Sequence, residues 1–354
     1  MRTREATIHA EESYAAAGTG VYPIRETDPI SRLLIPFGVT VGAAARLAHH
    51  AAALTKVEIV DGSDVLFSLD GLQTDGIARF DAHGSAGMWT SPSASITEYG
   101  NLVIDFGRYL YDKTLAFDPT KFKNPQIKIT RSLTTTEATC TAVIVAIHAY
   151  LMEGLSSSPI GFLQKKEIKS WTAAAAAWEY TEMPKDYAYR RLYLQGLTKT
   201  IGVGTHWSRA RLSENNDKSI PFDVLVDDQI ALNAREFGDI IENCSGAISA
   251  VATPFFAAPA YGGSVMAMCT MATNALEGHN RDGGQYEVKS ANGTDDFRGI
   301  VVGLAPQGLV CFNMGPSDEI EDFYDPSQLG SLQLEVLGAG AYTIHLLGEQ
   351  LRTY

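Results

Sequence analysis

Histidine side chains are the first candidates for chemistry in this chain, because they ligate metals and transfer protons. His49 and His50 are adjacent, whereas His206, His279 and His345 stand apart from each other. Neighbouring residues on a helix or a strand point in different directions, so His49 and His50 are not expected to face one ion. We therefore predict no metal site, and we interpret the separate histidines as ordinary core or surface residues.

Oxygen-rich segments are the second candidates. Asp61-Gly62-Ser63-Asp64 and Asn215-Asn216-Asp217 carry the oxygen ligands that calcium prefers, but neither has the spacing of an EF-hand loop. Asp and Asn side chains also bond to their own backbone in turns. We interpret both segments as turns.

Residues for covalent or acid–base catalysis are poorly arranged in the sequence. Gly84-Ser85-Ala86-Gly87 lacks the G-x-S-x-G spacing of a nucleophile elbow. Asp227 and Asp228 are adjacent, and adjacent strand residues point to opposite faces, so they cannot flank one glycosidic bond. Neither a P-loop nor a dinucleotide fingerprint follows a strand. We predict no catalytic residue and no cofactor, and we do not expect an enzyme.

Aromatic residues form one regular pattern. Tyr187, Tyr189, Arg191 and Tyr193 would share one face of a strand. Tyr and Arg are enriched at interface hot spots, so this face suits a subunit interface, but it suits an ordinary sheet face equally well. A further group that could stack on sugars comprises Trp171, Trp178 and Tyr180.

The composition is that of a globular protein, with 45% hydrophobic and 19% charged residues over 354 positions. The net charge is −13, and 28 basic residues face 41 acidic ones, which argues against wrapping of nucleic acid. We interpret Lys165-Lys166 as part of a solvated face. Four scattered cysteines without a C-x-x-C motif are expected to be buried free thiols. The N-terminus has no apolar signal core, so synthesis in the cytoplasm is expected.

Alternation of apolar and polar residues predicts mainly strands. The stretch from Leu33 to Val41 alternates with period two, and Pro36 within it suggests an edge strand or a bulge. Residues 141–151 are apolar on both faces, which favours a central strand. Asp61-Gly62 predicts a hairpin, and residues 43–54 predict a short helix. Many short strands separated by Gly and Pro indicate an all-β sandwich or barrel.

Two parts of the sequence repeat about 155 residues apart. Arg32-Leu33-Leu34-Ile35-Pro36-Phe37-Gly38 is echoed by Arg190-Arg191-Leu192-Tyr193-Leu194-Gln195-Gly196. Asp75-Gly76-Ile77-Ala78 is echoed by Asp228-Gln229-Ile230-Ala231 at nearly the same offset. These echoes predict a duplicated β-domain.

The two halves resemble the double jelly-roll major capsid proteins of tailless icosahedral, often membrane-containing, DNA viruses such as bacteriophages. The resemblance lies in the two repeated strands just quoted, in residues 54–64, which look like the start of a first roll, and in residues 343–352, which look like a last strand. It implies two tandem jelly-roll sandwiches with short helices in loops. We expect an N-terminal arm at 1–25, a first jelly roll at 26–152, a linker at 153–186 and a second jelly roll at 187–354.

The resemblance also implies a role in the virion. Three chains would form a homotrimer with a pseudo-hexagonal outline, and trimers would tile an icosahedral capsid around the genome. Penton and minor capsid proteins would be partners, as would an inner viral membrane, touched by residues 1–20 through Arg2 and Arg4. Residues 252–284, rich in Gly, Ala and Pro, would cover a partner or the trimer seam. The alternatives are a two-domain carbohydrate-binding or carbohydrate-active protein and a viral spike or fibre.

Overall fold

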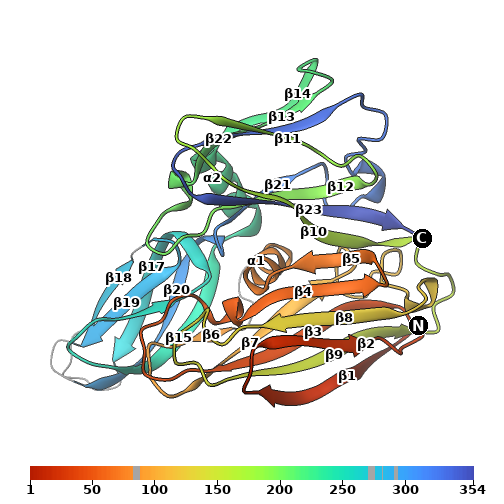
Figure 1. Cartoon of the computed structure of the whole chain (residues 1–354). Helices are drawn as coiled ribbons and strands as arrows, with labels where there is room; N and C mark the ends of the chain where they lie inside the picture. The colour runs from red at the N-terminus through yellow and green to blue at the C-terminus, as the bar shows by residue number, and fades with distance from the viewer. Residues whose placement is uncertain (83–87, 270–275, 281, 291–293) are drawn as a thin grey trace.

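The regular structure of the chain is mainly β-strand, as a computed structural model shows for residues 1–82, 88–269, 276–280, 282–290 and 294–354 (Figure 1). Two α-helices lie in this described part, α1 at Gly71–Asp81 and α2 at Val226–Phe237. None of the described helices is long and apolar enough to cross a membrane. The expected all-β architecture with short helices in loops is confirmed.

The first half forms a sandwich of two four-stranded layers. One layer has the strand order β1-β9-β3-β7, and the other has the order β2-β8-β4-β5. Helix α1 follows β5, and the two-residue strand β6 (Trp89–Thr90) precedes β7. The bounds of the eight sandwich strands are β1 Arg2–Tyr14, β2 Gly18–Pro23, β3 Ile30–Thr40, β4 Leu54–Asp61, β5 Asp64–Leu69, β7 Thr97–Asp105, β8 Pro125–Arg131 and β9 Ala142–Glu153.

The second half repeats this topology strand for strand. Its layers have the orders β10-β23-β12-β21 and β11-β22-β13-β14, which are the orders of the first half with each strand replaced by its counterpart. The repeated sequence segments lie on β3 and β12 and on α1 and α2, so the predicted duplication is confirmed. The strand bounds are β10 Gly161–Thr172, β11 Trp178–Glu182, β12 Ala188–Gln195, β13 Trp207–Glu214, β14 Ser219–Leu225, β21 Leu309–Asn313, β22 Leu332–Gly338 and β23 Thr343–Thr353.

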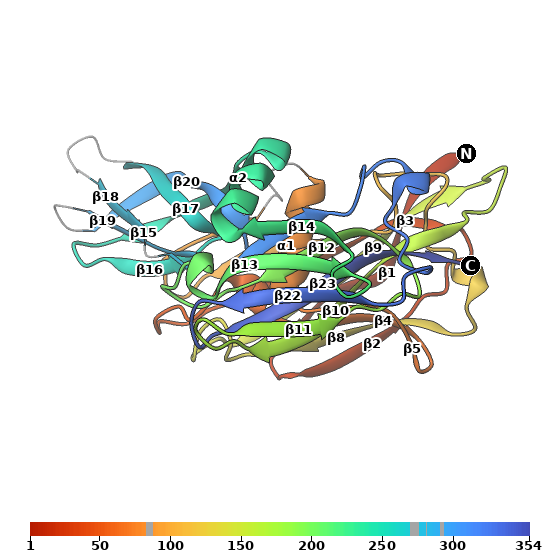
Figure 2. The ribbon, with the colours of Figure 1, turned by 90° about the horizontal axis from the view of Figure 1, so that it is seen from above.

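An insertion between α2 and β21 distinguishes the second roll from the first. Its strands form the sheets β17-β20-β15-β6 and β16-β19-β18 around a small core of their own. The insertion lies at the opposite end of the molecule from both chain termini (Figures 1 and 2). The strand bounds are β15 Ile240–Ile248, β16 Thr253–Phe256, β17 Pro259–Cys269, β18 Leu276–Asn280, β19 Gln285–Ser290 and β20 Asp295–Pro306.

The expected N-terminal arm and the expected linker are both parts of rolls. Within residues 1–25, β1 pairs with β9 and β2 pairs with β8. Within residues 153–186, β10 pairs with β23 and β11 pairs with β22. Each roll therefore begins with two strands that the sequence boundaries assigned elsewhere. Strand β1 was not recognisable in the sequence, because Ala6 is its single buried residue and polar side chains occupy most of both faces.

The individual strand predictions have mixed outcomes. Strand β3 forms as predicted, but it is an interior strand between β9 and β7, and its pairing with β9 resumes in the same register after Ile35 and Pro36. Residues 141–151 lie in the central strand β9, and the Asp61-Gly62 hairpin joins β4 to β5. The helix expected at 43–54 is reduced to a 3-10 turn at His50–Ala53.

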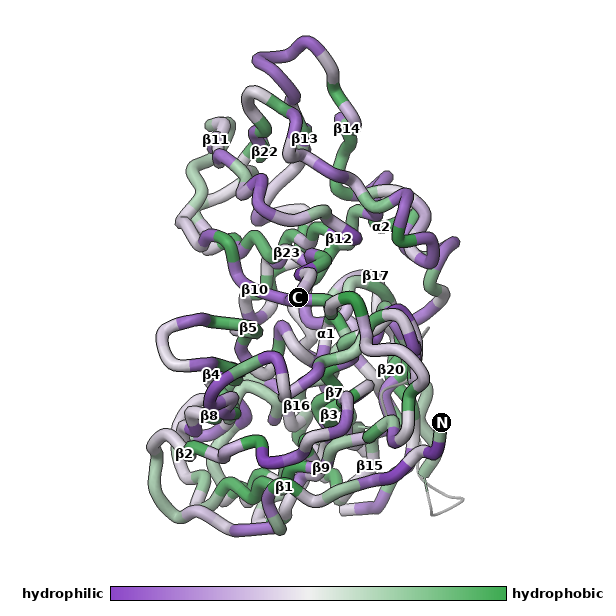
Figure 3. Tube along the Cα trace, turned by 90° about the vertical axis from the view of Figure 1, so that its right-hand side faces the viewer, coloured by the Kyte–Doolittle hydropathy of each residue, from purple (hydrophilic) through white to green (hydrophobic). Residues whose placement is uncertain are grey.

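The two rolls are fused through one continuous sheet of eight strands, β2-β8-β4-β5-β10-β23-β12-β21. A single parallel bridge between Ser68 of β5 and Lys166 of β10 makes the connection. The apolar core of the first roll is centred on β3, β4 and β9 and takes in Tyr193, Leu309 and Leu347 of the second roll, and a second core is centred on β12, β13 and β22. The polar hairpin between β13 and β14 protrudes at the far end of the second roll (Figure 3). The arrangement leaves a polar junction between the cores.

Candidate functional site: the buried junction between the two rolls

A cluster of five charged side chains joins the first roll to the second, and we call it the inter-roll cluster. Asp81 at the end of α1 faces Lys165 of β10, Arg190 and Arg191 of β12 and Glu349 of β23. The Asp81 carboxylate lies 3.1 Å from Arg190, 2.6 Å from Arg191 and 3.3 Å from Lys165. Glu349 accepts a 2.9 Å hydrogen bond from Arg190. One carboxylate from the first roll thus receives three cations from the second.

The electrostatics of the inter-roll cluster favour ionised carboxylates. Burial alone would raise the pKa of Asp81, but Lys165, Arg191 and Arg190 outweigh it and hold that pKa well below its usual range. Burial alone would also raise the pKa of Glu349, but Arg190 and Lys165 lower it below its usual value. Removing one partner of this cluster would leave an uncompensated buried charge at the junction, which is strongly destabilising.

The interpretation of Lys165-Lys166 as a solvated face is wrong for the first residue. Lys165 is 3% exposed and lies inside the inter-roll cluster. Burial lowers the pKa of Lys166, which lies half-buried beside Arg352 and Asp64. The error arose because residues 153–186 were expected to form a linker, whereas Lys165 lies on strand β10, which borders the first roll.

The aromatic pattern around Arg191 is part of the chain's own interior. Tyr189 and Tyr193 are fully buried, and the Tyr193 hydroxyl donates a 2.9 Å hydrogen bond to Glu349. A register shift between Tyr189 and Arg191 breaks the period-two face that the sequence suggested. The ordinary sheet face is therefore the better of the two interpretations for these tyrosines.

A second buried polar cluster, the histidine junction, ties the first roll to the insertion. His49 and His50 stack with ring centroids 4.1 Å apart, and His49 Nε2 lies 3.0 Å from Glu242 of β15. Arg79 of α1 donates to Glu242 at 2.8 Å and to Asp75 at 3.0 Å. All five side chains are buried. The prediction that His49 and His50 would diverge is wrong, because His49 is extended and His50 begins a 3-10 turn.

The histidine junction contains the one His/Cys/carboxylate group in the described residues that could hold a metal ion. The ligand atoms of His49, His50 and Glu242 all lie within 4.8 Å of one another. His49 already uses its ring fully, since Nδ1 accepts from the Ala51 amide at 3.2 Å and Nε2 faces Glu242. An ion would have to replace the proton between Nε2 and the carboxylate. The geometry therefore suits a hydrogen bond between His49 and Glu242, whereas both buried ring nitrogens of His50 have no hydrogen-bond partner among the described residues.

Glu242 is the residue of this junction that we expect to matter most for stability. Burial opposes ionisation, but His49 and Arg79 lower the pKa of Glu242 to about 2. We expect Glu242→Gln to destabilise the protein by about 3–5 kcal/mol, because Arg79 and His49 lose a buried counter-charge and Arg79 keeps only Asp75. The pKa is lowered on folding, so the contribution is complete above the usual glutamate value and is lost as the pH falls toward 2. Guanidinium unfolding at pH 7 and at pH 3 should show a smaller difference between variant and wild type at pH 3; an equal difference would contradict this assignment.

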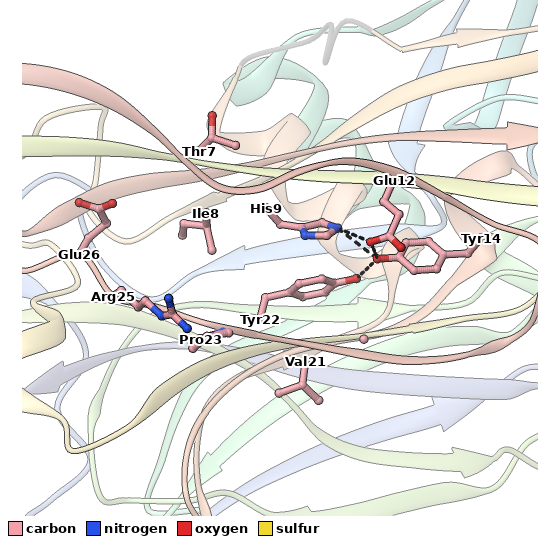
Figure 4. A pocket seen from close by; sticks show the side chains of 11 residues that line it. Thr7, Ile8, His9, Glu12, Tyr14, Val21, Tyr22, Pro23, Arg25 and Glu26 are labelled. Atoms are coloured by element: carbon pink, nitrogen blue, oxygen red, sulfur yellow. Dashed lines mark hydrogen bonds and ion pairs between the residues drawn. The ribbon is translucent and has the colours of Figure 1, made fainter.

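A groove of about 660 Å³ runs between β1 and β2, which are edge strands of the two layers of the first roll (Figure 4). Its floor holds a hydrogen-bonded set in which Tyr14 donates to Glu12 at 2.8 Å and lies 3.0 Å from the Tyr22 hydroxyl. His9 stacks on Tyr22 with ring centroids 4.4 Å apart. The groove is shallow and polar, and its side chains bond mainly to one another.

The remaining candidates from the sequence do not converge. Asp227 and Asp228 lie in the first turn of α2, where Asp227 accepts from Tyr261 at 2.8 Å. Asp61 accepts a hydrogen bond from the Asn124 amide and Asn215 accepts one from the Gly330 amide, each from a distant part of the sequence. Gly84-Ser85-Ala86-Gly87 lies outside the described residues. The described histidines outside the junction have separate surroundings: His206 contacts Gly202, His279 is near Glu277, and His345 bonds to Glu167.

The fold defines the class of protein that this chain resembles: two tandem jelly rolls of identical topology. Comparison of the sequence with models of known families finds no match, and comparison with curated proteins finds none either. Solved structures do match.

Three of the similar structures come from viruses. The STIV MCP aligns with a TM-score of 0.62 at 10% identity, covering 100% of this chain and 97% of that one. The major capsid protein P2 from bacteriophage PM2 gives 0.57 at 7% identity, with 100% and 98% covered. The PBCV-1 virus capsid chain gives 0.55 at 8% identity, with 99% and 94% covered. At these identities the likeness establishes the double jelly-roll fold.

Proposed function

We propose that this chain is a viral major capsid protein that assembles into an icosahedral shell. The observation that carries the proposal is the duplicated roll, matched over nearly the full length of both chains to proteins described as capsid components. The buried polar clusters of the chain support a structural role, because they tie the two rolls and the insertion together.

The duplication explains how such a chain would tile. Three copies supply six rolls of the same topology, and six similar rolls can close into a ring with a hexagonal outline. A hexagonal unit packs into a shell with the same contacts on every side. We therefore propose a homotrimer as the building block.

The insertion and the termini give the proposed trimer an orientation. They lie at opposite ends of the chain (Figures 1 and 2), so we propose that the insertion faces outward and the termini face the interior. Penton proteins, minor capsid proteins and any inner membrane would be further partners. A free arm cannot make the membrane contact as first expected, because Arg4 pairs with Glu153 and Glu26 within the first roll.

The carbohydrate-binding alternative is not favoured. Sugar platforms need several exposed aromatic rings together; Tyr180 is 54% exposed, but Trp207 is fully buried and Trp89, Trp171 and Trp178 are partly buried. A net charge of −13 likewise gives no support for sequence-specific binding of nucleic acid.

The mass of the purified chain in solution tests the proposed building block. Multi-angle light scattering at micromolar concentration should give three times the chain mass of 38.2 kDa, and electron microscopy should show hexagonal outlines. The interfaces of such a unit should be obligate, burying more than about 2,000 Å² in total. A monomer by light scattering together with rod-like or featureless particles would refute the proposal.

A further inference from the structure

The junction inside one chain shows which surfaces of a roll pack against another roll. In the first roll these surfaces are β5 and α1, and in the second roll the facing surface is centred on β10. Because the rolls have the same topology, each surface has a counterpart. Strand β14 with helix α2 corresponds to β5 with α1, and β1 corresponds to β10.

The β14–α2 surface and the β1 surface are exposed, whereas the equivalent β5–α1 and β10 surfaces are buried within the chain. Helix α1 has nine buried residues of eleven, whereas α2 has four of twelve. Strand β14 has no buried residue, although half of β5 is buried. The first five residues of β10 are buried, against Ala6 alone on β1. Both β1 and β14 end their sheets in the described chain, so their outer backbone groups are open to a partner.

Large apolar side chains are exposed on the β14–α2 surface. Ile220 and Leu225 on β14 are 37% and 52% exposed, and Leu232 on α2 is 53% exposed. Ile220 and Leu225 are five positions apart and so point to opposite faces of β14, which spreads these exposed apolar side chains over the strand and the helix. On the other surface, the groove between β1 and β2 leaves room beside the edge strand.

We infer that β14 and α2 of one chain pack against β1 of a second copy of this chain, in the way that β5 and α1 pack against β10 within the chain. The inference rests on the proposed trimer and specifies its interface. A heterologous contact of this kind repeats from copy to copy and closes when three copies have supplied six rolls.

The register of the two rolls identifies a residue pair. Ser68 lies three residues before α1, as Asp223 lies three residues before α2. Lys166 is five residues after the start of β10, as Thr7 is five residues after the start of β1. Since Ser68 pairs with Lys166, Asp223 of one chain should lie beside Thr7 of the next. Both residues are exposed in the single chain.

Disulfide cross-linking of the full-length chain tests this pair. The double variant Thr7→Cys/Asp223→Cys, oxidised at micromolar concentration, should give covalent dimers and trimers on a non-reducing gel, because a disulfide needs Cα atoms about 4.4–6.8 Å apart. Each single variant should stay monomeric on the gel. Asp223 forms an exposed pair with Arg209, so its loss should cost no more than about 1 kcal/mol.

Two control pairs separate the possible outcomes. Ser68→Cys/Lys166→Cys reports the intrachain junction and should cross-link within one chain, and Thr7→Cys/Tyr180→Cys places the second thiol on β11, away from the inferred contact. If the wild type is a trimer, and Thr7→Cys/Tyr180→Cys cross-links while Thr7→Cys/Asp223→Cys does not, the inferred interface is overturned and the proposed trimer stands. A wild-type monomer with no interchain cross-link would overturn both.

Discussion

Asp81→Asn should destabilise the protein by about 3–5 kcal/mol, because it leaves buried cations without their shared counter-charge. The Asp81 side chain is 8% exposed and lies within 3.3 Å of Lys165, Arg190 and Arg191. Glu349 alone would then face three positive groups. The loss should appear as a lower midpoint of guanidinium unfolding at pH 7, and the rolls should separate before either one unfolds.

Asp64→Asn is the matched control for this prediction. Asp64 also pairs across the rolls, with Arg352 of β23, but its side chain is 46% exposed. Exposed ion pairs contribute about 0–1 kcal/mol, so this variant should unfold close to the wild type. If both variants shift the midpoint equally, the inter-roll cluster does not hold the rolls together.

The parts of the fold that the sequence predicted are those with strong local patterns. Strand β3 alternates cleanly, β9 is apolar on both faces, and Asp61-Gly62 fits only a tight turn. The duplication could be detected because each pair of repeated sequence segments lies on elements that occupy equivalent positions in the two rolls. Strand β1 was missed because polar side chains occupy most of both its faces, which removes the alternation on which such predictions depend.

The buried clusters could not be predicted from local sequence. Arg190-Arg191 and His49-His50 were noticed, but their partners Asp81 and Glu242 lie more than 100 residues away along the chain. The argument that adjacent histidines diverge holds inside a regular helix or strand. It fails at His49, where the backbone changes from extended to 3-10 geometry between the two residues.

Removal of residues 1–23 should abolish stable folding of the first roll, because it deletes two strands of the sandwich. Strand β1 pairs along nearly the whole of β9, and β2 pairs along β8. Their loss would expose both edges and open the core around Ala6 and Tyr22. The effect should exceed the 5–15 kcal/mol that typically stabilises a domain, so the truncated chain should be insoluble or lose its cooperative thermal transition.

The double variant Arg2→Ala/Arg4→Ala tests whether the charges on β1, as distinct from the strand itself, contribute to stability. It removes the contacts of both arginines with Glu153 but keeps β1 in place. These pairs are partly exposed, so we expect a shift of about 1 kcal/mol or less and an unchanged oligomer. A truncated chain that melts like the wild type would show that residues 1–23 are a detachable arm after all, and the equivalence of β1 with β10, on which the inferred interface depends, would then be lost.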